Sequence, residues 1–340
     1  MKRTNIIIPI VAVVVLVGLM AFDYNRRTST QPAPTTTLRG KALGTFYQIT
    51  IKGTPSPSFE ARLDSLFAAA NSSMSIFYSE SLLSRINRGE TDQADPYIAH
   101  CITLAERVSQ LSDGAYDITI RPLVEAYGFA GKEAARKPNV DSLLEFVGYE
   151  KLSLDGLRVI KADPRLTIDL NSIAKGATVD MVADLVASEG FTDYLVDIGG
   201  ELRCCGTNAH GQKWAVGVET PFEGNYSLTG EHITKVLRVS EVGMATSGNY
   251  RNFRTDSLGN KFTHIINPVT GENTASNLLS ATVVAESCAL ADAYGTMFIS
   301  LGLERAQKVA LDNHIAALFI YDDGGKMKLF TTPEMLPYLD

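Results

Sequence analysis

The chain has few of the residues that build disulfide-stapled or zinc-bound folds. It contains 4 cysteines and 5 histidines among 340 residues, and no pair of them has the spacing typical of a zinc site. Cys204 and Cys205 are adjacent, which disfavours a disulfide between them, so we interpret them as strand residues. The sequence therefore excludes a disulfide scaffold.

Basic residues are also in the minority. The chain has 31 lysines and arginines against 38 aspartates and glutamates, which gives a net charge of −7. This balance argues against broad nucleic-acid binding, because such binding needs a basic surface that replaces counterions. A polyanionic ligand would need a local device to offset its charge, such as a metal ion or a helix N-terminus.

The sequence also lacks internal repeats and the glycine fingerprint of a Rossmann domain. Apolar periodicity predicts helices over residues 57–76, 96–111 and 172–189, the second with Asp95 as its N-cap. Strands are predicted over residues 41–52, 166–170, 194–198, 214–219, 235–239, 278–284, 315–321 and 326–330. The mixed order and the expected hairpins predict an α+β fold, with mixed or antiparallel sheets packed against helices.

The N-terminus carries a localisation signal. An uncharged apolar stretch runs from Ile6 to Phe22 after Lys2 and Arg3; its length of about 17 residues is short for a membrane span and also fits a signal peptide. It lacks a convincing cleavage site and a following cysteine for lipid attachment. We therefore expect residues 1–27 to be an uncleaved membrane anchor, with a signal segment as the alternative. Residues 28–37 are predicted to be a flexible linker, and residues 38–340 one folded domain.

The first candidate site segment spans residues 169–176, where a predicted strand leads into a helix. Lys175 lies in the first helical turn, where a cation is unfavourable unless an anion balances it. The unpaired N–H groups of a helix N-terminus favour the same kind of ligand, so a phosphate is expected here. The simpler alternative is that Asp169 or Asn171 caps the helix and Lys175 is solvated.

The second candidate segment spans residues 291–296. Asp292 and Thr296 are four residues apart and share one face of a predicted helix. A carboxylate and a hydroxyl at this spacing can bind a hard cation such as Mg²⁺, and Gly295 would leave its carbonyl approachable. The alternative is a solvated aspartate, with the Thr296 hydroxyl bonded to the backbone carbonyl of Asp292.

Two further segments hold a histidine and a pair of aromatic residues. His264 lies on a strand that leads into a turn at residues 267–271, and a histidine there can act as a general base near neutral pH; a structural histidine is the alternative. Phe77 and Tyr78 follow a predicted helix and can stack on a flat ring, or simply pack in the core. Gly199 and Gly200 permit close backbone approach or mark a bulge.

In combination these segments are similar to one known family. Eight motifs in order resemble the ApbE family, the FAD:protein FMN transferases; they lie at residues 42–45, 74–77 with 84–87, 114–117, 169–176, 196–200, 246–250, 264–271 and 291–296. The resemblance implies an ApbE-like (T-fold-like) core. It also implies a Mg²⁺-dependent enzyme that cleaves FAD, attaches FMN to a Ser or Thr hydroxyl of an acceptor protein through a phosphoester bond, and releases AMP.

The resemblance also assigns roles to individual residues. It implies metal ligation by the side chains of Asp292 and Thr296, with backbone oxygens near Ser172 and Gly295, and it implies that His264 assists the acceptor hydroxyl. The implied flavin contacts are Leu43, Phe77, Tyr78, Ala115, Tyr116, Asp117, Asp169, Lys175, Ile265 and Ile266. Leu43 stands where the family often has methionine.

The family's acceptors are typically membrane redox subunits outside the cytoplasm, which implies an inner-membrane anchor and a periplasmic catalytic domain here. The chain has no acceptor motif of its own, so we expect modification of a partner protein. Mg²⁺ and Lys175 would offset the charge of the FAD diphosphate and of the AMP leaving group. The alternatives are an FAD pyrophosphatase, in which water replaces the acceptor hydroxyl, and a non-catalytic flavin-binding protein tethered to the membrane.

Overall fold

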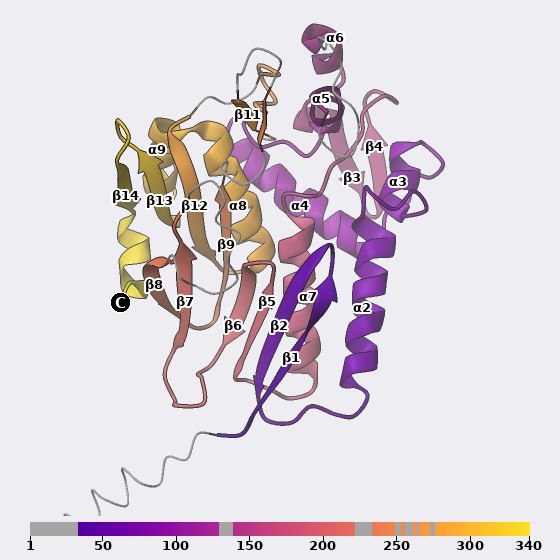
Figure 1. The fold of residues 1–340 in the computed structure, drawn as a ribbon. Helices are drawn as coiled ribbons and strands as arrows, with labels where there is room; N and C mark the ends of the chain where they lie inside the picture. Colours follow the sequence, from indigo (N-terminus) through magenta and orange to yellow (C-terminus); the bar gives the residue numbers. More distant parts are fainter. Residues whose placement is uncertain are drawn as a thin grey trace, which may run out of the picture.

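The fold is built on an eight-stranded antiparallel sheet. The computed structural model describes residues 33–128, 139–221, 233–248, 253–255, 261–263, 266–272 and 276–340 (Figure 1). In spatial order the strands are β1 (Thr35–Ala42), β2 (Thr45–Lys52), β5 (Tyr194–Ile198), β6 (Glu201–Cys205), β9 (Val242–Gly248), β12 (Leu278–Ala285), β13 (Ala316–Asp322) and β14 (Met327–Thr331). All neighbouring pairs are antiparallel, which confirms the predicted α+β class.

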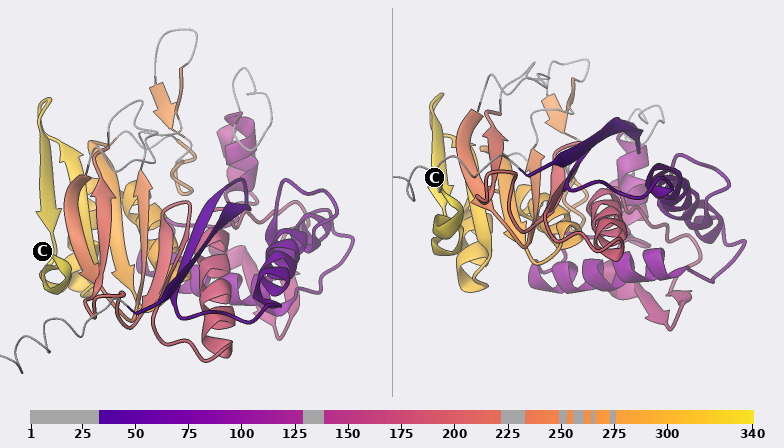
Figure 2. Two further views of the ribbon diagram at one scale, coloured as in Figure 1. Left: turned by 60° about the horizontal axis from the view of Figure 1, so that its bottom comes forward. Right: turned by 90° about the horizontal axis from the view of Figure 1, so that it is seen from below.

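Helices cover one face of this sheet (Figures 1 and 2). The main ones are α2 (Phe59–Met74), α4 (Pro96–Leu111), α7 (Ala174–Ser188), α8 (Cys288–Leu301) and α9 (Leu303–Asp312). The smaller elements are α3 (Leu82–Asn87), α5 (Arg121–Ala126), α6 (Val140–Leu144), η1 (Tyr149–Lys151), β3 (Leu152–Asp155), β4 (Arg158–Lys161), β10 (Phe253–Thr255), β11 (Lys261–Thr263) and η2 (Pro333–Tyr338).

The second face of the sheet is covered by a hairpin of β7 (Trp214–Glu219) and β8 (Ile233–Val239). The alternation along β13 shows that the sheet is buried on both sides. Phe319 packs in the helix-side core, whereas Leu318 and Ile320 pack in the core beneath the hairpin. Successive strand residues point to opposite faces, and both faces are buried here. The sequence of β13 is therefore a continuous apolar run.

Helix α8 is the central helix of the helical layer. Every residue of α8 except Thr296 is buried. Two glycines permit its close approach to neighbouring elements: a Cβ added to Gly176 of α7 would lie 2.5 Å from the Cys288 carbonyl oxygen, and one added to Gly243 of β9 would overlap the Cys288 nitrogen. Protein interiors tolerate no such overlap, so both positions require glycine.

The first turn of α8 is capped by a residue from another helix. The carboxylate of Asp180, on α7, accepts hydrogen bonds from the N–H groups of Cys288 at 2.9 Å and Ala289 at 2.8 Å. The Ser287 hydroxyl accepts a third from the N–H of Leu290 at 3.2 Å. These bonds satisfy donors that have no partner within the helix, and they fix the start of α8 against α7.

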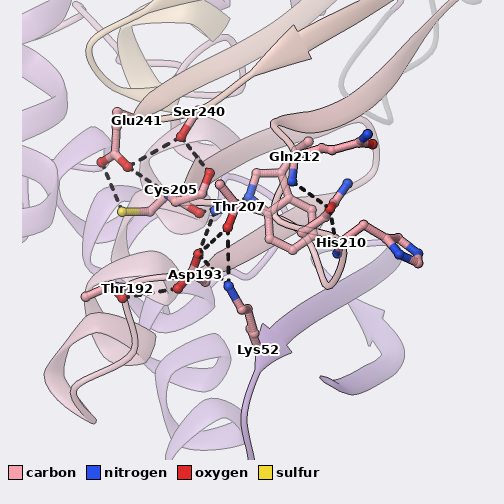
Figure 3. Close-up of polar contacts among 12 residues, drawn as sticks. Lys52, Thr192, Asp193, Cys205, Thr207, His210, Gln212, Ser240 and Glu241 are labelled. Carbon is pink, nitrogen blue, oxygen red and sulfur yellow. Dashed lines mark hydrogen bonds and ion pairs between the residues drawn. The ribbon is translucent and has the colours of Figure 1, made fainter. Parts of the chain in front are cut away.

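The end of the sheet where the described chain begins is held by a satisfied polar cluster (Figure 3). Asp193 accepts hydrogen bonds from the N–H of Thr207 at 2.7 Å and from Lys52 Nζ at 3.3 Å. The N–H of Ala33 donates to the carbonyl oxygen of Ala209 at 3.2 Å. Because Thr207 and Ala209 follow the C-terminal end of β6, the chain enters at the end of the sheet opposite to Glu201.

Most predicted elements are confirmed. The Asp95 carboxylate accepts a hydrogen bond from the N–H of Ile98 at 2.9 Å, as expected of the N-cap of α4. Helix α7 begins two residues after the predicted start, and β5 and β7 have the predicted bounds. Cys204 and Cys205 are unpaired strand residues of β6.

Three predictions at strand boundaries were wrong. Strand β1 begins at Thr35, within the segment predicted as a linker, because residues 35–37 pair with β2. The single strand predicted over residues 41–52 is instead a hairpin, whose two-residue turn has Leu43 at φ 50° and Gly44 at φ 75°. Such left-handed pairs match the twist of a two-residue hairpin. Residues 166–170 are not a strand, since no ladder forms there.

None of the helices that the structure describes combines the length and the apolarity needed to cross a membrane. The anchor predicted over residues 1–27 lies outside the described residues.

We expect the Asp180→Ala substitution to lower the free energy of unfolding by about 1–2 kcal/mol, because it leaves two N–H groups of α8 without their acceptor. Asp184, one turn later on α7, is exposed, so Asp184→Ala is the matched control and should change stability by less than about 0.5 kcal/mol. Urea unfolding of both variants tests this. Equal effects would show that the cap does not stabilise α8.

Candidate active site

One face of α8 contacts three of the segments that the sequence singled out. Asp292, Thr296 and Ser300 follow one another at intervals of four residues and so share a face. Asp292 Oδ2 accepts a hydrogen bond from the N–H of Gly176 at 3.0 Å, and the Ser300 hydroxyl donates to the carbonyl oxygen of Ala115 at 2.5 Å. Thr296 Oγ1 lies 3.4 Å from the hydroxyl oxygen of Ser247 on β9. The helix thus places the start of α7, the end of β9 and the 114–117 segment around its polar face.

The Asp292 carboxyl group is buried, with 5% of the residue exposed. The alternative of a solvated aspartate is therefore wrong. Burial raises the pKa of Asp292, the nearby Glu201 carboxylate raises it further, and Lys175 and the Gly176 N–H only partly oppose this, so the pKa rises to about 8. An acid in this position is costly to ionise alone, and a bound cation would relieve the cost.

Lys175 forms an ion pair, so the alternative of a solvated lysine is wrong. Its Nζ lies 2.6 Å from Oε2 of Glu201, whose side chain is almost fully buried, while 34% of the Lys175 side chain remains exposed. Burial alone would lower the pKa of Lys175, but the charges of Glu201 and Asp292 outweigh it and raise the pKa. The ammonium group therefore stays charged at the edge of the site.

Glu201 is held in place by the tight turn between β5 and β6. Ile198 and Glu201 are the last paired residues of this hairpin, and Gly199 and Gly200 form the turn with φ values of 63° and 96°. Asp197 Oδ1 accepts a hydrogen bond from the N–H of Gly200 at 2.9 Å. The two glycines therefore form a hairpin turn, which only glycine adopts without strain, and not a bulge.

Two irregular segments cross beside α8. The N–H of Asp169 donates to the carbonyl oxygen of Ile118 at 2.7 Å, and the Ser172 hydroxyl donates to the Tyr116 hydroxyl at 2.9 Å. The Asn87 side chain replaces a neighbouring strand, since it pairs with both the N–H and the carbonyl of Ile168. This explains why residues 166–170 need no ladder, and it brings Tyr116, Asp169 and Ser172 together.

Two buried carboxyl groups belong to these segments. Asp169 accepts a hydrogen bond from the N–H of Asn171 at 2.8 Å and does not cap α7, whose N-cap residue is Ile173. Burial raises the pKa of Asp169, and this bond opposes the shift. Asp117 accepts a hydrogen bond from the N–H of Thr119 at 2.7 Å, and burial raises its pKa to about 6. Such groups can hydrogen-bond the polar edge of a heterocycle.

Phe77 and Tyr78 lie outside the core, so the core-packing alternative is wrong. They are 71% and 42% exposed. The N–H groups of both residues donate to the Ser75 hydroxyl at 3.2 Å, which fixes the turn that presents them. Adjacent exposed aromatic rings offer a surface for a flat ligand.

The remaining predicted residues differ in their surroundings. Leu43 lies in the β1–β2 turn, and Ile266 is buried in a small core with Leu123 and Val147. Gly295 packs against β9, where an added Cβ would lie 2.8 Å from the Ser247 hydroxyl. His264 and Ile265 lie outside the described residues. Within the described ranges, no hydrogen bond or ion pair links Leu43, Phe77 or Tyr78 to the α8 face.

The sequence reasoning assigned no role to three residues of this region, namely Glu201, Ser247 and Ser300, although Ser247 lies within the matched segment 246–250. Ser300 continues the four-residue spacing of Asp292 and Thr296, so the helical pattern alone could have indicated it. Glu201 follows a Gly-Gly turn, so the sequence indicates that it begins a strand. The sequence does not indicate that its side chain pairs with Lys175. In the described part of the chain, no group of three or more His, Cys, Asp or Glu residues is placed to bind a metal ion.

Comparisons with known proteins identify close relatives of this architecture. The model of the ApbE family matches residues 43–319. The chain is 32% identical to the FAD:protein FMN transferase of Vibrio cholerae over 323 residues, covering 91% of this chain and 94% of the relative. It is 33% identical to that of Haemophilus influenzae over 308 residues, covering 85% and 87%.

Solved structures agree with the sequence comparisons. The flavin transferase ApbE from Vibrio cholerae superposes with a TM-score of 0.80 at 31% identity, covering 91% of this chain and all of that one. The apo form of the Pseudomonas stutzeri flavinyl transferase ApbE superposes with a TM-score of 0.79 at 27% identity, covering 89% and 96%.

The raised pKa of Asp292 predicts a pH-dependent loss of stability in metal-free protein. Between the usual value of 3.8 and about 8, the unfolded state has released the proton that the folded state retains. The free energy of unfolding therefore falls with rising pH, by at most about 1.4 kcal/mol per pH unit from this group. Asp292→Asn should remove this contribution, and denaturant unfolding in a chelator from pH 4 to 8 measures it. Asp184→Asn is the control; a slope unchanged by Asp292→Asn would contradict the assignment.

Proposed function

The chain belongs to the ApbE family, and from this premise we infer that it is an FAD:protein FMN transferase. Such an enzyme transfers FMN from FAD to an acceptor protein. The observation that carries this function is the buried carboxyl of Asp292, held against the first turn of α7 beside the charged Lys175. A cluster of this kind fits a diphosphate that is accompanied by a divalent cation better than it fits a neutral ligand.

We propose that Mg²⁺ binds to the side chains of Asp292 and Thr296 and to backbone oxygens of Ser172 and Gly295. The donor set fits, because it consists of hard oxygen ligands. Mg²⁺ commonly uses one or two carboxylates, with substrate phosphates and waters completing the shell, and so needs no cluster of acidic residues. The Oδ2 atom of Asp292 accepts the hydrogen bond from the Gly176 N–H, which leaves Oδ1 as the oxygen that would bind the metal. When bound, the ion would neutralise charge on the phosphoryl oxygens.

The protein's own residues bind and orient the nucleotide. The positive end of α7 and the ammonium group of Lys175 lie where the diphosphate would be held. The exposed ring of Phe77, with Tyr78, is suited to stack on the flavin, and Asp117 and Asp169 are suited to hydrogen-bond its polar edge.

The transfer itself needs an acceptor hydroxyl close to the FMN phosphorus. The hydroxyl oxygen of an acceptor Ser or Thr forms a bond to this phosphorus, the bond from phosphorus to the bridging oxygen breaks, and AMP leaves with that oxygen. We assign His264 to take the proton of the hydroxyl. No covalent enzyme intermediate is needed, because positioning supplies the rate advantage.

We further propose that the acceptor is a separate protein, a membrane redox subunit, and that residues 1–27 anchor the enzyme in the inner membrane with its catalytic domain in the periplasm. The apolar run from Ile6 to Phe22 supports the anchor. The described chain begins beside Ala209, at the end of the sheet opposite to Glu201. A tether at this end would leave the active site facing away from the membrane.

The transferase reaction predicts a mass gain equal to one FMN on an acceptor protein incubated with the enzyme, FAD and Mg²⁺. Asp292→Ala should reduce this gain at least about a hundredfold, because it removes the only charged ligand of the proposed metal site. Asp184→Ala is the matched control and should retain activity. Mass spectrometry of the acceptor, with quantification of free FMN, measures the outcome. Free FMN without labelled acceptor would identify a pyrophosphatase, and flavin binding without AMP release would identify a binding protein.

A further inference from the structure

The charges around Lys175 do not favour a free anion. Its ammonium group is 2.6 Å from Glu201 Oε2, and the carboxyls of Asp292 and Asp197 are close enough to interact with it electrostatically. One cation is thus surrounded by three acidic groups. The charge that would attract a diphosphate is already balanced before any ligand arrives.

Glu201 is built into this position with little freedom to leave it. The residue is 5% exposed and pairs with Ile198 directly after the Gly199–Gly200 turn. Lys175 is anchored by its backbone in the first turn of α7, with about a third of its side chain exposed. The carboxylate therefore lies beneath the ammonium group, and a nucleotide that approached Lys175 from solvent would meet both charges.

We propose that Glu201 is a positioning residue that holds Lys175 and cancels its charge, so that FAD binds tightly only together with the divalent cation. Without Glu201, Lys175 alone would attract the diphosphate. With Glu201 present, Lys175 has no uncompensated charge with which to attract a bare diphosphate, and the dication supplies the missing positive charge. This inference rests on the proposed function, since it concerns the same nucleotide site.

The physical basis is the free-energy coupling between two ligands. The attraction between the dication and the diphosphate makes each ligand strengthen the binding of the other. The Glu201 carboxylate acts on each ligand separately, because it repels the nucleotide and attracts the cation. Removal of this negative charge should strengthen nucleotide binding and weaken cation binding, each by roughly tenfold, the effect of about 1.4 kcal/mol.

The test is FAD binding to the full chain, monitored by flavin fluorescence. It is measured in a chelator and again at one fixed Mg²⁺ concentration below the dissociation constant of Mg²⁺ for the nucleotide-free protein. For Glu201→Gln we expect FAD affinity in the chelator to rise about tenfold, and the factor by which Mg²⁺ strengthens binding to fall by the same amount. A merely structural role would instead weaken FAD binding equally in both conditions. That result, or an unchanged factor, would overturn the proposal.

Two further variants control the experiment. Glu201→Asp keeps the charge and should retain a strong dependence on Mg²⁺. Asp193→Asn disrupts the Lys52–Asp193 ion pair at the opposite end of the sheet (Figure 3) and should leave the dependence unchanged. If it changes the dependence as much as Glu201→Gln does, the effect is not local and the proposal fails.

Lys175→Gln removes the positive charge of the Lys175–Glu201 pair, and it tests the proposal if the Glu201→Gln protein does not fold. It should weaken FAD binding in the chelator and enlarge the factor by which Mg²⁺ strengthens it; a smaller factor would contradict the proposal. FMN transfer to an acceptor is measured separately. A protein that transfers no FMN but loses its metal dependence with Glu201→Gln would refute the proposed function and leave this inference standing.

Discussion

The burial of one carboxyl group between two packed helices is the constraint on which the site depends. Moving a carboxylate out of water costs several kcal/mol unless other groups compensate it. Asp292 receives one backbone N–H at 3.0 Å and lies near a lysine that already has a partner. The protein alone therefore leaves the charge under-compensated, which is the condition that a bound cation would relieve. The raised pKa of Asp292 expresses the same imbalance.

Tight packing around α8 keeps this unfavourable arrangement in place. Glycines on α7, on β9 and in α8 itself, at positions 176, 243 and 295, allow the backbones to approach more closely than any side chain would permit. The Asp180 cap fixes the first turn of the helix. With its axis and rotation set in this way, α8 can point three polar residues at intervals of four into one region. The apolar remainder of the helix is buried in the core and offsets the cost of those polar groups.

Local patterns predicted the elements but not their partners. The apolar periodicity from Leu290 to Leu301 predicts this helix and indicates that Asp292 and Thr296 share a face. Nothing in either segment indicates that Lys175 meets Glu201, since that pairing depends on the placement of the β5–β6 turn beside the start of α7. The false strand at residues 166–170 has a similar cause: its apolar residues are buried, but the Asn87 side chain takes the place of a neighbouring strand. The sequence also left open whether Phe77 is exposed, because a stacking surface and a core aromatic have the same local pattern.

A comparison of the two ends of the sheet separates structural from functional charge. Both ends have a lysine paired with an acid beside the end of a strand. At Asp193, hydrogen bonds from Thr207 and the charge of Lys52 outweigh the effect of burial and lower the pKa of the carboxyl. At the other end Lys175 is paired with Glu201, and at the neighbouring Asp292 burial and this second acid outweigh the lysine and raise the pKa. The first pair is complete within the protein and stabilises the fold. Among the residues that the structure describes, the Asp292 carboxyl has no partner of its own with a positive charge, and a cationic ligand would supply one, which is why we place the proposed functional site at that end.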